Sequence, residues 1–447
     1  MADVLSSQHP EVDHSRAGHT DTSCEEDFAL HGTVETRSSN LKSTSAAVNV
    51  QVEVVVVQDA YTRGIHDVED AFATFLESDE AKESKNGPLA TIVYRLVDHH
   101  RLSARGDGDG NNNANKNDGT LEGRWAAGAV RNTGVEASTA PVLTFLDADD
   151  VWKEDHLLRV HRALANRPHL GWAKFPMEFT LPVHGYWRRV VERISPINAG
   201  VRRSAHALVG GFPDMINEDQ TYWNVLRACT HGLDAPDPPE NEGEFPIDDT
   251  PTSVYIARPG NHLFEQREKF SHGPEDMFRY AREDDNGETE RTRSAAELAM
   301  LRLCVGNIRA AGPSIFPFAN LPAALSVLGT LQYKHGDMNL AEMHLRESLS
   351  MNPEKADTQY NLGNLLHKTG RPLEAELSYR AALRITPAHS QARNNLAGIL
   401  FEQGDMDGAE IEWRALIREQ PEFEDARRNL ASLQAARGIG RVHRTKL

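Results

Sequence analysis

The amino-acid sequence predicts two folds in succession: an α/β domain with a mixed, Rossmann-like sheet, then an all-α solenoid of helical repeats. The first prediction comes from two β-branched runs that flank a stretch of helical periodicity between residues 51 and 98. The second comes from residue types that return every 34 positions after residue 322. A length of 447 residues agrees with two or three domains rather than one.

The α/β domain is expected at residues 51–270. Residues 1–50 precede it and are polar, so we expect them to be largely disordered. Within the domain, "VQVEVVVVQDA" predicts a buried strand ending at Asp59, "HDVEDAFATFLESDEAK" an amphipathic helix, and "LATIVYRLV" a second strand. A strand, a helix and a strand in this order form a βαβ unit, which implies parallel strands.

An acidic cluster follows the next predicted strand. Residues 102–123 are rich in Gly, Asn and Asp and predict a surface loop, "AAGAVRNTGVEAS" predicts a helix, and "APVLTFL" predicts a strand. Directly after that strand come Asp147, Asp149 and Asp150, whose charges repel one another. Either a divalent cation compensates them, or Asp149 or Asp150 caps the helix predicted for "WKEDHLLRVHRAL". Open α/β sheets usually bind ligands at the carboxyl ends of strands.

Four features recur in register in the C-terminal part of the chain. They are the pairs Leu328-Gly329, Leu362-Gly363, Leu396-Ala397 and Leu430-Ala431, the glycines Gly336, Gly370, Gly404 and Gly438, the alanines Ala341, Ala375 and Ala409, and the prolines Pro353, Pro387 and Pro421. This pattern resembles the tetratricopeptide repeat, a pair of helices with Gly at the turn between them. We expect repeats at 322–355, 356–389 and 390–423, a capping helix at 424–437, and a linker with a connecting helix at 271–321.

The α/β region resembles the inverting family-2 glycosyltransferases of the GT-A fold. Four pieces carry the resemblance, and they occur in the family's order. They are "VVVVQDAYTRG", similar to the strand that ends in a nucleotide-binding turn, "AVRNTGVEAS", similar to the Ala-Arg-Asn-x-Gly segment, "FLDADDVW", similar to the DxD motif, and "INAGVRRSAHALVGGFPDMINEDQTYW", similar to the acceptor-side stretch. The resemblance implies a nucleotide-diphosphate sugar as donor and Mn²⁺ or Mg²⁺ as cofactor.

The resemblance also implies roles for donor-side residues. Asp147 and Asp149 would bind the metal together with the diphosphate, which suits the preference of these cations for carboxylate and phosphate oxygens. Asp59 would contact the nucleotide base, and Arg131 would lie near the donor, although a structural salt bridge explains Arg131 equally well. His262 is either a further metal ligand or an ordinary loop histidine.

The N-terminal strand of the family is not reproduced in residues 1–51. In an alternative register, "VEVVVVQDAYTR" is that first strand, Tyr61 contacts the nucleotide and Asp98 binds the base. This register leaves no helix or third strand before Arg131, so the first register is preferred.

The resemblance assigns the acceptor side to the Glu-Asp pair of "NEDQTYW". Asp219 would be the base that takes the proton of the acceptor hydroxyl, with Glu218 as the other candidate. Without the resemblance, both carboxylates are explained by a solvated first turn of a helix, where negative charge is favourable.

Composition and charge limit the partners. A formal net charge of −18 argues against a general nucleic-acid binder. No run of ~20 apolar residues predicts a membrane span, and the N-terminus lacks the pattern of a secretory signal, so a cytoplasmic protein is expected. Three cysteines at distant positions indicate neither a disulfide framework nor a zinc site.

The sequence therefore favours a metal-dependent glycosyltransferase that acts on a glycan or protein acceptor. The repeats would bind a protein or peptide through polar residues on the first helices of the repeats: Gln359, Asn361, Asn364, Arg393, Asn394 and Asn395. The main alternative is a tetratricopeptide adaptor with a degenerate, inactive transferase domain, and a nucleotidyltransferase is a third. If the repeats only deliver an acceptor, truncation after about residue 315 should leave donor hydrolysis intact.

Overall fold

The computed structural model describes residues 50–58, 73–78, 82, 90–98, 127–147, 150–153, 155–165, 167–182, 186–191, 196–215, 218–234, 251–256, 288–312 and 316–444. The predictions made for residues 1–49, for the loop at 102–123 and for Asp59, Tyr61, Asp149 and His262 lie outside these residues.

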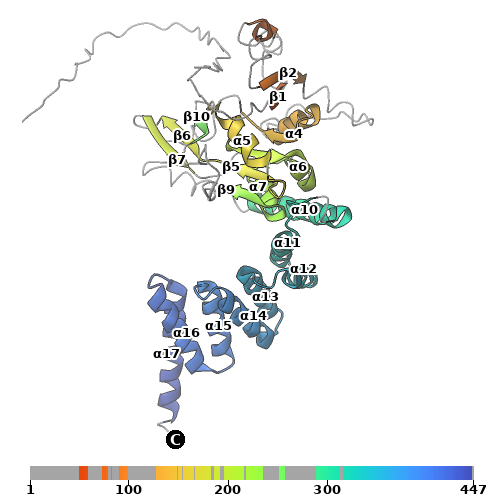
Figure 1. Ribbon diagram of the computed structural model, residues 1–447. Coiled ribbons are helices and arrows are strands. Elements are labelled where there is room, and N and C mark those ends of the chain that lie inside the picture. The colour runs from red at the N-terminus through yellow and green to blue at the C-terminus, as the bar shows by residue number, and fades with distance from the viewer. Residues whose placement is uncertain are drawn as a thin grey trace, which may run out of the picture. The chain divides into compact units, whose positions relative to one another are not determined.

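The described part of the α/β domain contains ten strands and four α-helices (Figure 1). In chain order they are β1 (Val50–Gln58), β2 (Ala90–Asp98), α4 (Ala127–Ala137), β3 (Val142–Thr144), β4 (Val151–Trp152), α5 (His156–Ala165), β5 (Trp172–Lys174), β6 (Met177–Pro182), β7 (Tyr186–Val191), the 3₁₀ turn η1 (Pro196–Asn198), β8 (Ala199–Arg202), α6 (Arg203–Val209), α7 (Glu218–Cys229), β9 (Gly232–Asp234) and β10 (Ser253–Ile256).

The strands form three sheets, and together they confirm a mixed α/β class. β1 and β2 are parallel over their full length, as expected for a βαβ unit, and residues 73–77 between them are helical. A second sheet has the order β3-β8-β5-β9, with β8 antiparallel to both neighbours and β5 parallel to β9. The third has the order β4-β10-β6-β7. In the described residues β3 pairs with β8, so the acidic cluster follows a strand of the second sheet.

The β3-β8-β5-β9 sheet is covered on both faces. Successive side chains of a strand point to opposite faces. Accordingly, Trp172 belongs to a buried cluster with α6 and α7, whereas Ala173 packs with Val160 and Leu164 of α5. The sheet therefore holds α5, which follows the acidic cluster, and α7, which begins with Glu218 and Asp219, on opposite sides.

The hydrophobic core beneath α7 continues into the helices that follow the α/β domain. The helix α10 (Glu288–Ala311) packs against α6 and α7 and lies within the stretch expected to hold a connecting helix. Leu301 of α10 and Leu325 and Leu328 of α11 (Leu321–His335) are buried in one cluster with Trp223 and Leu226 of α7. Their exposed fractions do not exceed 1%. The first repeat helix is thus part of the core that supports α7.

Two backbone hydrogen bonds and a disulfide fix the same junction. The amide of His231 donates to the carbonyl of Phe318, and the amide of Asn320 donates to the carbonyl of Cys229, both at 2.7 Å. Cys229 of α7 and Cys304 of α10 are joined in a disulfide and are fully buried. The cysteine spacing does not predict this pair, because 75 residues separate its members and only the packing of α10 on α7 brings them together.

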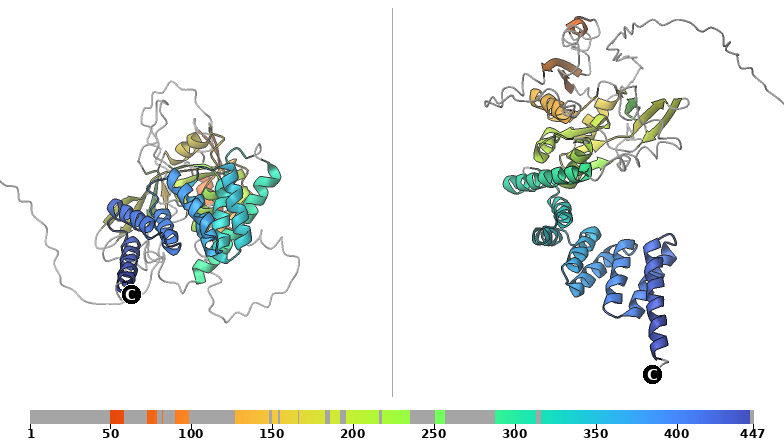
Figure 2. Two further views of the ribbon diagram at one scale, coloured as in Figure 1. Left: turned by 90° about the horizontal axis from the view of Figure 1, so that it is seen from below. Right: turned by 180° about the vertical axis from the view of Figure 1, so that it is seen from behind.

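The C-terminal helices form antiparallel pairs at the predicted repeat positions (Figures 1 and 2). After α11 they are α12 (Met338–Met351), α13 (Ala356–Lys368), α14 (Pro372–Ile385), α15 (Ser390–Glu402), α16 (Met406–Glu419) and α17 (Glu424–Arg444), the last of which extends beyond the expected capping helix. Below, the odd-numbered helices α11, α13 and α15 are called A helices, and α12, α14 and α16 are called B helices. Among the described helices, none has the length and apolar character to cross a membrane.

The recurring glycines perform two tasks. Gly336, Gly370 and Gly404 have φ angles of 92°, 76° and 87° and end the A helices, since Gly adopts this left-handed conformation without strain. Gly363 lets the A and B helices approach closely, because a Cβ there would lie 2.6 Å from the ring of Tyr379. The glycine of the Leu-Gly pair on the A helix therefore packs against a large buried side chain of the B helix, here Tyr379.

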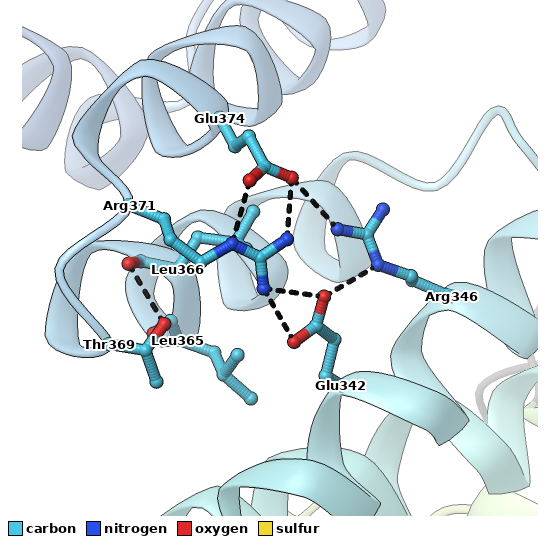
Figure 3. Close-up of polar contacts among 7 residues, drawn as sticks. All are labelled: Glu342, Arg346, Leu365, Leu366, Thr369, Arg371 and Glu374. Carbon is cyan, nitrogen blue, oxygen red and sulfur yellow. Dashed lines mark hydrogen bonds and ion pairs between the residues drawn. The ribbon is translucent and has the colours of Figure 1, made fainter.

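A ring of four charged side chains joins the first two repeats (Figure 3). Arg371 donates to both carboxylate oxygens of Glu342, at 2.9 and 2.8 Å, and also binds Glu374. Arg346 donates to Glu342 at 2.8 Å and to Glu374 at 3.2 Å, which closes the ring. The hydrogen bonds from Arg371 lower the pKa of the Glu374 carboxyl, so the pairs stay charged at neutral pH.

Candidate functional site

One face of α4 presents the residues that assemble the site. Arg131 and Asn132 lie about one helical turn after Gly128, which places both next to Gly128 on one face of the helix. A Cβ on Gly128 would lie 2.8 Å from the carbonyl oxygen of Pro213 and 2.9 Å from Cγ of Glu218. The absence of a side chain at Gly128 therefore lets α4 touch the segment that precedes α7.

Arg131 connects the acidic cluster after β3 with the carboxylate pair at the start of α7. Its Nη2 donates to the two carboxylate oxygens of Asp147 at 3.0 and 2.9 Å, and its Nη1 donates to Oε1 of Glu218 at 2.7 Å. The side chains of Arg131 and Glu218 are 12% and 13% exposed, whereas that of Asp147 is 41% exposed. Two predicted parts of the site, 71 residues apart in sequence, thus meet through one guanidinium, and Asp147 still faces solvent.

The electrostatics of this triad follow from its burial. Burial alone would lower the pKa of Arg131, but the charges of Asp147 and Glu218 outweigh it and raise the pKa. The pKa of Glu218 is raised, first by burial and also by the nearby charge of Asp219, while Arg131 opposes the shift. The Arg131 guanidinium is already bound to two carboxylates, so its direct effect is to hold them in place.

The described residues after β3 test whether Asp150 caps the helix α5. The amide of Asp150 donates to the carbonyl of Asp147 at 3.1 Å, and the strand β4 follows immediately. The helix α5 begins only at His156, whose amide donates to the carbonyl of Lys153. Asp150 is therefore not the cap of α5.

Asp219 lies in the first turn of α7. Its Oδ1 accepts a hydrogen bond of 2.7 Å from the backbone amide of Gln220. A carboxylate is favourable at this helix end because the first amide groups of a helix have no partner within the helix. Glu218, next to it, uses its carboxylate for Arg131. Of the two carboxylates, Asp219 is the one that is not engaged by a cation in the described residues.

The sequence did not single out Asn132, which fixes the Gly-Gly-Phe turn. Its Nδ2 donates to the carbonyl of Phe212 at 2.8 Å, and its Oδ1 accepts from the amide of Phe212 at 3.0 Å. Gly211 has a φ of 81°, and a Cβ there would lie 2.8 Å from Oδ1 of Asn132. The position of Asn132 beside Arg131 in the Ala-Arg-Asn segment was the available signal. Consecutive residues of α4 thus fix the turn before α7 and the first carboxylate of α7.

A neutral histidine joins the strand that leads to Asp147 to the neighbouring sheet. His156 stacks on Trp152, and its ring nitrogens lie 3.2 Å from Oγ1 of Thr144 and 2.9 Å from Oγ1 of Thr252. Since the Thr144 hydroxyl donates to the carbonyl of Ala199, the ring must donate to Thr144 and accept from Thr252. Burial, with a smaller effect of the nearby Arg159 charge, lowers the pKa of His156 to about 3.

Asp147 supplies the type of ligand, a carboxylate oxygen, that hard divalent cations prefer. No cluster of three or more His, Cys, Asp and Glu side chains exists among the described residues. Mg²⁺ is usually bound by one or two carboxylates together with substrate phosphates and water. Asp147 meets this need, because its carboxylate is partly exposed and each carboxylate oxygen can accept more than one contact.

A second candidate site lies in the repeats, as a hollow of about 600 Å³. Its lining residues come from A helices, B helices and α17: Tyr333, Asn364, His367, Lys368, Tyr379, Asn394, Asn395, Gly398, Phe401, Glu402, Trp413, Asn429 and Ser432. Three of the six predicted partner-binding residues are among them, namely Asn364, Asn394 and Asn395. A fourth, Asn361, donates to Oγ1 of Thr330 on the neighbouring A helix at 3.0 Å.

The two remaining predicted residues lie elsewhere. Gln359 lines a different, shallower hollow between α12 and α14. Arg393 is 16% exposed; it donates to the carbonyl of Pro387 and lies 3.6 Å from both Glu412 and Glu419. Both residues occupy the fourth position of their repeats, a position that turns toward the B helices.

The described fold is a mixed α/β domain followed by paired helical repeats. Comparison with protein families agrees: residues 120–206 match glycosyl transferase family 2, and residues 327–390 and 370–413 match the tetratricopeptide repeat. The predicted order of the two families is thereby confirmed. The first match includes Arg131 and Asp147 and ends before Glu218, which is connected to the matched segment through its contact with Arg131.

Solved structures of TPR domains are among those that match part of this chain. The first TPR of Spaghetti (RPAP3), bound to an HSP90 peptide, is 14% identical with a TM-score of 0.26, and the match covers 26% of this chain and 94% of that one. The MamA crystal structure is 20% identical with a TM-score of 0.29, covering 35% and 86%. The TPR domain of Arabidopsis OM64 is 18% identical with a TM-score of 0.25, covering 26% and 94%. No curated protein matches the chain.

Proposed function

We propose that the α/β domain is a metal-dependent glycosyltransferase that moves a sugar from a nucleotide diphosphate to an acceptor hydroxyl with inversion. The observation that supports it is the Arg131 bridge, which brings Asp147 of the donor-side motif to the carboxylate pair at the start of α7. The family match over residues 120–206 supports the same reaction class.

The proposed chemistry divides between two sides of the site. Asp219 takes the proton of the acceptor hydroxyl, while the hydroxyl oxygen attacks the anomeric carbon and the bond to the diphosphate oxygen breaks. Asp147 and Asp149 hold a Mn²⁺ or Mg²⁺, which would supply positive charge to the departing diphosphate. Arg131 and Asn132 keep the two sides at a fixed distance, since one binds both carboxylates and the other fixes the turn before α7. Asp59 contacts the nucleotide base.

The experiment is a screen of sugar nucleotides for metal-dependent binding and hydrolysis by the full chain, followed by transfer to glycan and peptide acceptors. Asp219→Asn keeps the shape of the side chain but cannot accept the proton, so transfer should fall by ~10²–10⁴ with donor binding unchanged. Asp149→Ala should remove the metal dependence of donor binding. Asp214 is an exposed carboxylate in the segment that precedes α7. Asp214→Asn is the matched control and should leave both transfer and metal-dependent donor binding unchanged.

The outcomes separate the two main hypotheses. A wild-type chain that binds and hydrolyses no sugar nucleotide with either metal would contradict the transferase and favour an adaptor with an inactive domain. If transfer occurs and survives in Asp219→Asn, Glu218 is the next candidate for the base.

We also propose that the hollow in the repeats binds an extended peptide through its backbone carbonyl groups. Oδ1 of Asn364 accepts from the Tyr379 hydroxyl at 2.8 Å and from Nδ2 of Asn395 at 2.9 Å. Oδ1 of Asn394 likewise accepts from Nε1 of Trp413 at 3.0 Å and from Asn429 at 3.1 Å. The indole of Trp413 can only donate, so Asn394 must present its carbonyl oxygen to it, and the carbonyl oxygen of Asn364 accepts from both Asn395 and Tyr379. The NH₂ of Asn364 has no acceptor in the described residues and is available to a ligand carbonyl.

This proposal is tested by selecting peptides from a random library on the full chain and measuring their affinity. Asn364→Ala should weaken a selected peptide by about tenfold or more, the loss typical of a hydrogen bond in a buried groove. Gln359→Ala provides the matched control. This amide precedes Asn364 on the same helix, α13, but it lines the other hollow. Equal affinities for both variants would contradict the assignment of the groove.

A further inference from the structure

Every B helix carries a large, exposed apolar side chain at the same repeat position, on the side opposite its core. Met343, Leu377 and Ile411 are 34 residues apart and are 49%, 69% and 66% exposed. In each helix the buried Ala lies two positions before this residue, and the buried Leu345, Tyr379 or Trp413 lies two positions after it. Because two positions correspond to about 200° of rotation, the apolar residue points away from the core. We name Met343, Leu377 and Ile411 the outer stripe.

The packing of the repeats does not account for the outer stripe. A single exposed apolar residue is ordinary, but the same position in three consecutive repeats is a pattern. In the central repeat, Leu373 lies one turn before Leu377 on the same side and is 70% exposed. In α12, Leu340 likewise lies about one turn before Met343 and is 43% exposed, so the stripe is widened in two of the three helices.

The charges beside the outer stripe are neutralised within the chain. Each apolar residue is preceded by a Glu that pairs with an Arg four positions later: Glu342 with Arg346 at 2.8 Å, Glu376 with Arg380 at 2.9 Å and Glu410 with Arg414 at 2.7 Å. Glu342 and Arg346 also belong to the closed ring of Figure 3. A surface with balanced charge does not select an acidic or a basic partner, and it can face an identical surface without net repulsion.

A hollow of about 370 Å³ adjoins the central residue of the stripe. It lies between α12 and α14, and Leu349, Leu362 and Leu377 contribute apolar surface to it. The central repeat thus has a protruding leucine on the rim of a hollow whose lining is partly apolar, with Arg346, Ser350, Gln359 and Ser378 as its polar members. A two-fold axis beside Leu377 would let the leucine of each copy enter the hollow of the other, which is the self-complementarity of an isologous interface.

We propose that the outer stripe is the dimerisation surface of this protein and that its partner is a second copy of the same chain. The helices of the two copies pack with the stripes antiparallel, so that Leu377 lies near the two-fold axis and Met343 faces Ile411 of the second copy. Equal spacing of the three residues allows both end contacts to form together with the central one. This proposal is independent of the glycosyltransferase activity.

The first test is the mass of the full chain in solution, measured by sedimentation over about 1–100 µM, where an interface of this modest size should dissociate. The wild type should show a concentration-dependent dimer. Leu377→Lys should raise its dissociation constant by ~10-fold or more, because burying the ammonium group in the hollow is unfavourable. The matched control is Leu158→Lys on α5, an apolar residue of 41% exposure outside the stripe, which should dimerise like the wild type.

The second test is geometric and does not depend on affinity. In a Cys24→Ser background, Leu377→Cys should form an intermolecular disulfide under mild oxidation, and so should a Met343→Cys chain mixed with an Ile411→Cys chain. Leu158→Cys should not. A wild type that stays monomeric throughout, or a dimer that is unchanged by Leu377→Lys, would overturn the proposal. So would cross-linking that is as fast at Leu158→Cys as at the stripe.

Discussion

At the scale of single residues, the neutral state of His156 links the stability of the segment after β3 to the pH of the solution. The imidazole is buried between Thr144 and Thr252, where a second proton would leave a charge without an anionic partner in the described contacts. His206 on α6 is a second case: its ring contacts the Tyr222 hydroxyl at 2.9 Å, and burial, with a smaller effect of Arg203, lowers its pKa to about 4. Both rings must lose their proton when the α/β domain folds.

We therefore predict that the free energy of unfolding of the α/β domain falls as the pH drops below about 6.5, the pKa of histidine in an unfolded chain. Because the folded-state pKa values are lowered, the unfolded chain binds more protons between pH 6.5 and the folded values near 3 and 4. Each histidine contributes a slope of up to about 1.4 kcal/mol per pH unit in this window. Urea unfolding at several pH values measures the slope.

The control for this prediction is a pair of histidine variants. His156→Gln removes one titrating group, so the slope between about pH 6.5 and 4.5 should decrease by up to about 1.4 kcal/mol per unit relative to wild type. His231→Gln removes an exposed histidine of the same domain and should leave the slope unchanged. Parallel curves for wild type and His156→Gln would show that His156 does not supply the effect.

Residue types were visible in the sequence, but the contacts between them were not. The resemblance identified Arg131, Asp147 and Glu218 as separate motif members, whereas the structure joins them through a single guanidinium. No spacing rule connects positions 131, 147 and 218, since their proximity depends on how α4 crosses the segment before α7. Asn132 was overlooked for the same reason, because its partner is the backbone of Phe212, which carries no sequence signal.

At the scale of elements, strongly periodic segments were the most predictable. The parallel β1 and β2, the helix α4 and the paired repeat helices occur where their patterns place them. The two-residue strand β4 could not be predicted, because so short a segment has no periodicity and exists only through pairing with β10. For the same reason Asp150 remained a candidate cap of α5 in the sequence analysis, although β4 separates Asp150 from the start of that helix.

Within the repeats, the 34-residue period predicted which helices carry the polar residues, but not which surface each side chain faces. Asn364, Asn394 and Asn395 line one hollow, while Gln359 of the same helix faces another and Arg393 turns toward α16. Adjacent positions of a helix are rotated by about 100°, so a run of polar residues reaches more than one surface. The assignment required knowledge of which side the B helices cover.

At the scale of the whole molecule, the α/β domain and the first repeat share one hydrophobic core. Leu325 and Leu328 of α11 are buried with α7 and α10, and Phe318 is 3% exposed beside them. The contacts therefore lead to a different expectation for truncation than the sequence alone. Cutting after residue 315 removes apolar side chains that support the helix carrying Glu218 and Asp219.

We predict that a chain ending at residue 315 loses its folded α/β domain, whereas a chain ending at residue 355, after α12, keeps it. Deleting one buried Leu down to Ala costs ~2–5 kcal/mol, so removing several together exceeds much of the ~5–15 kcal/mol that holds a domain folded. Circular dichroism and limited proteolysis of both truncations, with the full chain as reference, provide the measurement. A folded and protease-resistant 1–315 chain would mean that α11 is dispensable.

The shared core also has a consequence for how such a chain can be recombined. A junction through an exposed linker would allow another repeat array to be attached without change to the enzyme domain. Here the junction is a shared core that contains Cys229, Cys304 and the α11 leucines. The first helix pair is therefore inherited together with the α/β domain, and a different repeat array can replace only the helices after α12. A chimaera that swaps repeat arrays must therefore keep Phe318 to Lys355 from this chain and take the foreign sequence from α13 onward.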